Sequence, residues 1–64
     1  MKVREIIRLI ESDGWYRIKA RGGHRQYKHA VKPGRVTVPG QMKAELDKKT
    51  EKSILRQAGI DTNS

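Results

Sequence analysis

The chain has 64 residues, the length of one small domain, and contains no cysteine, so neither disulfides nor thiolate metal sites can supplement its core. Lys and Arg number 15 against 7 Asp and Glu, and this formal charge of +8 points to a polyanionic partner such as nucleic acid. The sequence contains neither an apolar run long enough to span a membrane nor the apolar core of a secretory signal, so we expect a cytoplasmic protein with no membrane association.

An amphipathic helix is predicted over residues 2–12. Its apolar residues follow the i, i+3, i+4, i+7 spacing that lines one helix face. They are Val3, Ile6, Ile7 and Ile10. Gly14 comes soon after, and glycine readily adopts the left-handed conformation that closes many helices, so the chain is expected to turn there.

Residues 15–21 are predicted to form the first strand of a sheet. Tyr16, Ile18 and Ala20 alternate with basic residues, so we expect these three to face the core. Trp15 is out of phase with this alternation, and we interpret it as a core anchor at the corner between helix and strand.

The second predicted strand covers residues 24–29, after a tight turn at Gly22-Gly23. If Tyr27 faces inward, Arg25 and His29 share its face, because side chains alternate along a strand. The opposite face then carries His24, Gln26 and Lys28.

Pro33 and Gly34 predict the next turn, because proline suits its first corner and glycine its second. A third strand over residues 35–38 turns its two valines inward and ends at Pro39, which cannot donate to a ladder. In the linker that follows, Leu46 is expected to cover the sheet edge.

A second helix is predicted to follow Asp47, a residue type that caps helix N-termini with its side chain. Its apolar stripe consists of Ile54, Leu55 and Ala58. Gly59 followed by Ile60 matches a glycine C-cap with its hydrophobic contact. We therefore predict a single domain over residues 1–60 and a polar tail over residues 61–64.

Helix, three antiparallel strands and helix predict an α+β fold with both helices on one face of the sheet. The other face is left to solvent, and the residues expected there are basic or able to form hydrogen bonds. They are Arg17, Lys19, Arg21, His24, Gln26, Lys28 and Thr37. Such a surface is suited to phosphate groups, so we hypothesise that it binds RNA.

The histidines suggest chemistry as well as binding. An imidazole exchanges a proton readily near neutral pH, and RNA supplies its own nucleophile in the 2′-hydroxyl. A base that removes this proton, beside cations that stabilise the charge on phosphate, is sufficient for strand cleavage without a metal.

His24 and His29 are five residues apart, which places them on opposite faces of a regular strand. They should therefore not act as an acid–base pair, and we interpret His29 as a surface contact or phosphate ligand. No Asp or Glu lies near either histidine in the sequence, so neither a metal site nor another cofactor is expected.

Four blocks in order, EIIRLIESDGW, GGHRQYKH, VTVP and SILRQAGI, resemble those of the HicA mRNA interferase toxins and span nearly the whole chain. The resemblance implies a double-stranded-RNA-binding-domain-like fold, ribosome-independent cleavage of mRNA that arrests growth, and a HicB antitoxin partner. In that family the catalytic histidine follows a Gly-Ser or similar pair at the start of the second strand, and Gly23-His24 occupies this place. Gly40 and Gln41 stand where many members carry a further histidine.

We therefore predict a metal-independent endoribonuclease toxin that is a monomer when free, with His24 as the proton-transfer group. The predicted RNA-binding residues are Lys19, Arg21, Gly23, Arg25 and Lys28. One alternative is a non-catalytic module that holds double-stranded RNA on the same sheet. Another is a structural basic protein ordered mainly on its RNA, although the clear helix periodicity favours a chain that folds alone.

Overall fold

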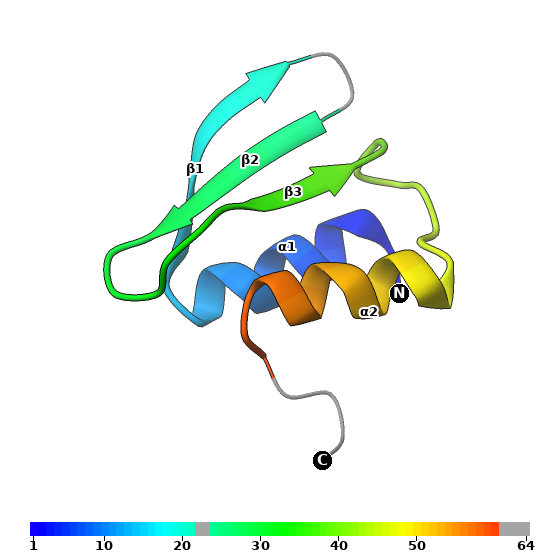
Figure 1. Ribbon diagram of the computed structural model, residues 1–64. Helices are drawn as coiled ribbons and strands as arrows, with labels where there is room; N and C mark the ends of the chain where they lie inside the picture. The colour runs from blue at the N-terminus through cyan, green and yellow to red at the C-terminus, as the bar shows by residue number, and fades with distance from the viewer. Residues whose placement is uncertain (22–23, 61–64) are drawn as a thin grey trace.

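The computed structural model contains two helices and one sheet, and it describes residues 1–21 and 24–60. In chain order the elements are α1 (Val3–Ser12), β1 (Trp15–Arg21), β2 (His24–His29), β3 (Val36–Pro39) and α2 (Lys48–Gln57). The strands are antiparallel in the order β1-β2-β3, and both helices lie on one face of the sheet (Figure 1). The predicted double-stranded-RNA-binding-domain-like fold is therefore confirmed. The expected turn at 22–23 and the tail at 61–64 lie outside the described residues.

The hydrophobic core fills the space between the sheet and the two helices. α1 contributes the four apolar residues predicted from its spacing, all of them buried. The other buried members of the core are Trp15, Tyr27, Val36, Val38, Leu46, Ile54, Leu55 and Ala58. Leu46 thus joins the core itself, as part of the segment that leads into α2.

The ends of α2 follow the capping chemistry predicted for them. The Asp47 carboxylate accepts a hydrogen bond from the backbone N–H of Thr50 at 2.8 Å, and hydrogen bonding by Thr50 lowers the pKa of Asp47. At the other end Gly59 has a φ of 67°, and Ile60 N–H donates to the carbonyl of Leu55 at 2.9 Å. Within the described residues, no helix has the length and apolar character needed to cross a bilayer.

The predicted core-facing residues of β1 are wrong, because none of the three is buried; Ala20 is exposed even though it pairs with the inward-facing Arg25. Tyr16 and Ile18 are 50% and 41% exposed, whereas Trp15 is buried. Arg17, which was expected on the outer face, pairs with the inward-facing Tyr27. The register shifts between Arg17 and Lys19, because a β-bulge inserts one extra residue and so reverses the alternation of side chains along the strand.

β2 and β3 match the predicted alternation. The pairs Arg25–Val38 and Tyr27–Val36 share the inner face, because directly paired residues of antiparallel strands lie on the same side of a sheet. The pairs His24–Pro39 and Gln26–Thr37 therefore lie on the outer face. β3 begins one residue later than predicted and includes Pro39 as its last residue.

His29 joins α1 to the segment that follows β2. Its Nδ1 accepts hydrogen bonds from the N–H groups of Val31 and Lys32, both at 3.0 Å. A ring nitrogen that accepts carries no hydrogen, so Nε2 is assigned the proton and donates to the Asp13 carbonyl at 2.8 Å. Both nitrogens are used inside the fold, which corrects our interpretation of His29 as a surface or phosphate contact.

Lys32 connects the C-terminal ends of both helices. Its Nζ pairs with the Asp13 carboxylate at 2.5 Å and donates to the Ala58 carbonyl at 3.1 Å. The indole N–H of Trp15 donates to the same Ala58 carbonyl at 3.2 Å. A cation placed at helix C-termini is favourable because the exposed carbonyls carry partial negative charge. These contacts hold the C-terminal end of α2 against the start of β1 and the segment that follows β2. We call them the Ala58 junction.

Replacing Gly14 by alanine should destabilise the protein more than the same change at Gly34. Both glycines have positive φ, 108° and 83°. A Cβ on Gly14 would lie 2.6 Å from Nε2 of His29, whereas one on Gly34 would meet nothing within 4 Å. We expect a loss of about 1 kcal/mol for Gly34→Ala and about 2 kcal/mol or more for Gly14→Ala. Thermal unfolding followed by circular dichroism measures both, and equal losses would show that the crowding at His29 has no energetic cost.

The Asp13–Lys32 ion pair predicts a specific sensitivity to acid. Hydrogen bonding by Lys32 lowers the pKa of Asp13 below its ordinary value of 3.8. A carboxyl whose pKa is lowered by folding stabilises the protein above the unfolded-state pKa, and this contribution disappears as the pH falls through the folded-state value. Melting temperatures measured at pH 7, 4 and 3 should therefore fall more steeply for the unmodified chain than for Asp13→Asn. Parallel curves would contradict a stabilising role for the pair.

Candidate functional site

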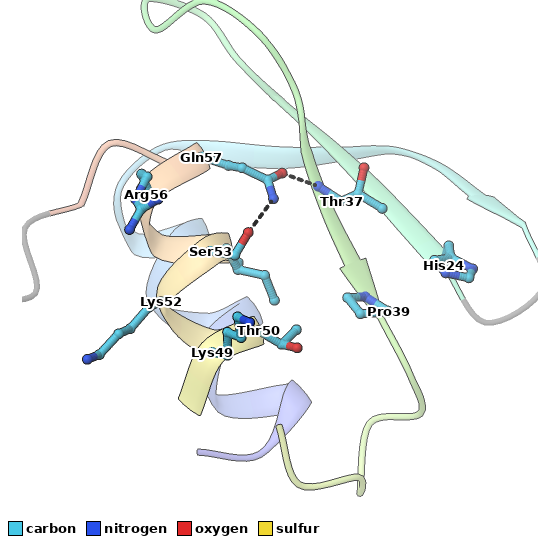
Figure 2. A pocket seen from close by; sticks show the side chains of 10 residues that line it. His24, Thr37, Pro39, Lys49, Thr50, Lys52, Ser53, Arg56 and Gln57 are labelled. Carbon is cyan, nitrogen blue, oxygen red and sulfur yellow. Dashed lines mark hydrogen bonds between the residues drawn. The ribbon is translucent and has the colours of Figure 1, made fainter. Parts of the chain in front are cut away.

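A groove of about 620 Å³ lies between α2 and the β3 side of the sheet, within the size range of ligand-binding pockets (Figure 2). The sheet contributes His24, Thr37 and Pro39 to its lining. The helix contributes Lys49, Thr50, Lys52, Ser53, Ile54, Arg56 and Gln57. Residues from two distant parts of the sequence therefore meet in one concave surface.

His24 is held at the sheet end of the groove. It is the first residue of β2, and its backbone pairs with Arg21 on one side and Pro39 on the other. Its neighbour Arg25 faces inward, so the side chain of His24 is on the outer face, where it is exposed. An imidazole in this position can reach a bound molecule while its backbone is fixed from both sides.

α2 supplies the positive charge of the groove. Lys49, Lys52 and Arg56 are spaced i, i+3 and i+7, which places them on one side of a helix. Our sequence interpretation missed these residues because it used this periodicity to find apolar stripes only. The same spacing, applied to basic residues, would have found them.

The side chain of Gln57 connects the two walls of the groove, α2 and β3, by hydrogen bonds. Its Oε1 accepts a hydrogen bond from the backbone N–H of Thr37 at 3.2 Å, and its Nε2 donates to Oγ of Ser53 at 3.4 Å (Figure 2). Among the residues that the structure describes, Thr37 belongs to the edge strand β3, and no further strand pairs with its outward N–H groups. The amide of Gln57 satisfies one of these groups and connects α2 to the sheet.

Two of the predicted RNA-binding residues lie beside His24 and Gln26 in the sheet register. The backbone of Lys19 pairs with Gln26 and that of Arg21 with His24, but their side chains lie outside the described part of the structure. Gly23 also lies outside the described residues.

Lys28 and Arg25 differ in what surrounds them. Lys28 is exposed on the outer face of β2. It lies four residues after His24 on that face, and its backbone pairs with Tyr16 of β1. Arg25 is half-buried on the inner face, and its Nη1 donates to the carbonyl of Gly40 at 2.7 Å. The fold therefore brings Lys28 to the same face as the groove histidine and gives Arg25 a structural contact.

Arg35 is a further cation that our sequence interpretation missed. It precedes β3, is exposed, and donates through Nη1 to Oε1 of Gln26 at 3.3 Å. Because Gln26 lies on the outer face beside Thr37, this contact brings Arg35 to the same side of the sheet as His24.

The groove combines an exposed imidazole with cationic and hydroxyl side chains, which are the groups needed to bind a phosphodiester and move a proton beside it. In residues 1–21 and 24–60, no three His, Cys, Asp or Glu side chains gather into a set that could hold a metal ion.

Comparison with protein-family models identifies the family. The model for the HicA toxin of bacterial toxin–antitoxin systems matches residues 3–60. The chain belongs to the HicA toxin family. The resemblance seen in the four sequence blocks is thus confirmed, and membership implies an antitoxin partner. No curated protein gave a significant match to the chain.

The contact between Arg25 and Gly40 predicts different effects of two charge deletions in this HicA toxin. Arg25→Ala should lower the free energy of unfolding by about 1 kcal/mol, because it removes a charged donor from the Gly40 carbonyl. Lys28→Ala removes the same charge from an exposed position and should change it by less than about 0.5 kcal/mol. Urea unfolding curves compare the two variants, and equal stabilities would show that the Arg25 contact contributes nothing.

Proposed function

We propose that this HicA toxin is a metal-independent endoribonuclease that cleaves mRNA without the ribosome and thereby arrests growth. The observation that carries the proposal is the position of His24, exposed at one end of a groove whose other wall bears Lys49, Lys52 and Arg56. A proton-transfer group and phosphate-binding cations thus share one surface.

The reaction uses the 2′-hydroxyl of the RNA as nucleophile. His24 accepts the hydroxyl proton as the 2′-oxygen attacks the adjacent phosphorus, and the bond from phosphorus to the 5′-oxygen breaks. The departing 5′-oxygen takes up a proton, which leaves a 2′,3′-cyclic phosphate and a 5′-hydroxyl. Nearby cations stabilise the negative charge that builds on the phosphate oxygens. DNA lacks the 2′-hydroxyl and should not be cleaved.

The sheet supplies further phosphate contacts in this proposal. Lys28 is exposed on the same face as His24, and the backbones of Lys19 and Arg21 pair with residues of that face. We propose these three side chains and the Gly23 backbone amide as RNA-binding groups. Arg25 joins them through the guanidinium N–H groups that are not directed at Gly40.

The antitoxin in this proposal is a HicB-like protein that covers His24 or the basic outer face of the sheet. An acidic surface on that protein would complement the formal charge of +8 and speed association. We expect the complex to form in the cytoplasm and the toxin to be a monomer when free of its antitoxin.

Substitution of His24 by alanine should abolish cleavage and leave RNA binding nearly unchanged. We expect the rate to fall by about 10²- to 10⁴-fold, the usual contribution of a general base. Because His24 is exposed, the variant should keep the fold, and a circular dichroism melt checks this. Labelled mRNA is incubated with each protein in EDTA, and the fragments are resolved on a denaturing gel.

Three outcomes of this experiment decide between enzyme and binding module. Cleavage by the unmodified chain alone supports the proposal, whereas equal cleavage by both proteins removes His24 from the mechanism. Intact RNA with both proteins, together with a retained shift on a native gel, would instead favour a non-catalytic module that binds double-stranded RNA. A DNA strand of the same sequence is the control and should remain intact.

A further inference from the structure

We propose that the groove between α2 and β3 binds the single-stranded stretch of RNA on one side of the cleaved phosphate, with α2 as its phosphate-binding wall. This inference rests on the proposed function, because it takes His24 as the point of cleavage. It adds a binding surface that is separate from the sheet residues considered above.

The charge of the groove is concentrated on the helix side. We call Lys49, Lys52 and Arg56 the basic margin. The ion pairs of the described residues join the N-terminal ammonium to Glu45 and Glu51, and Lys32 to Asp13. In this described part of the chain, none of the three cations of the basic margin pairs with a carboxylate. Their charges are therefore available to phosphate, whose binding releases counterions.

Among the described residues, the groove lining between the basic margin and His24 carries no charged side chain, and its hydroxyl and amide groups lie among apolar atoms that include those of Pro39 and Ile54. Figure 2 shows Thr50, Ser53 and Gln57 extending from α2 toward β3, while Lys52 and Arg56 extend from the other side of the helix. An RNA strand that connects His24 to the basic margin would therefore pass over these uncharged side chains.

The hydroxyl groups in the groove suit RNA. Thr37, Thr50 and Ser53 each present a hydroxyl that can both donate and accept a hydrogen bond. The ribose 2′-hydroxyl and the edges of unpaired bases need such versatile partners, and recognition of these edges requires bases that are not already paired. A single strand can lie in a concave groove with its bases turned inward, whereas a duplex keeps its base edges occupied.

The walls of the groove are fixed before RNA arrives. Gln57 connects α2 to the N–H of Thr37, and the Ala58 carbonyl is held by Trp15 and Lys32. A surface that is already ordered loses little conformational entropy when it binds, which favours affinity. The helix side chains that contact phosphate are thus presented at a set distance from His24.

The test measures binding of a short single-stranded RNA to proteins that carry His24→Ala, so that the RNA stays intact. Fluorescence anisotropy at several salt concentrations compares Lys52→Ala and Arg56→Ala with Lys48→Ala. Lys48 lies on the same helix but outside the groove lining, so it is a matched control for the loss of one charge. Each groove variant should bind about three- to tenfold more weakly and reduce the salt slope by about 0.7, whereas the control should change neither by as much.

Arg56→Lys keeps the positive charge and should restore most of the affinity that Arg56→Ala loses. This comparison separates the loss of a phosphate contact from a change in the stability of α2. Groove variants that bind as tightly as Lys48→Ala would overturn the proposal even if the unmodified chain cleaves RNA. The converse result, weaker binding by the groove variants but no cleavage by the unmodified chain, would support the groove and reject the enzyme. Duplex RNA that binds as well as the single strand, with the same losses, would overturn the single-strand assignment.

Discussion

The backbone carbonyl of Ala58 connects the C-terminal end of α2 to the start of β1 and to the segment that follows β2. It accepts one hydrogen bond from the indole of Trp15 and another from the ammonium of Lys32. Lys32 also pairs with Asp13, just beyond the end of α1. A domain of this size has a small core, and these contacts join Ala58 to residues 43 and 26 positions away in the sequence. Together with the buried side chains of Ile54, Leu55 and Ala58, the Ala58 junction sets the position of the C-terminal end of α2.

The position of α2 in turn determines the groove. α2 is held at its C-terminal end, both by the Ala58 carbonyl and by Gln57, the last residue of the helix, whose side-chain oxygen accepts a hydrogen bond from the open edge of β3. A shift of the helix along this edge would separate Gln57 from Thr37 and move the basic side chains relative to His24. The groove is therefore a consequence of packing, and its geometry depends on the contacts of Ala58 and Gln57 that fix α2 against the sheet.

The two histidines show how one residue type is divided between structure and function. His29 uses both ring nitrogens for contacts to backbone groups and packs edge-on against Trp15, with ring centroids 5.2 Å apart. His24 lies five residues earlier, on the opposite and exposed face of the same strand. The described carboxylates of Asp13 and Asp47 are likewise used in the fold, one in an ion pair and one in a helix cap. Much of the positive charge is left on the surface.

The sequence by itself determined the elements whose signals are local. Apolar spacing located α1, capping residues bounded α2, and the alternation in β2 separated Tyr27 from His24, because helices and strands impose fixed periodicities on side chains. Only the tertiary structure decided the β1 register, since the bulge at Ile18 arises from pairing with β2. It also decided the groove, because His24 and Arg56 are brought onto one surface by packing between segments that no local pattern relates.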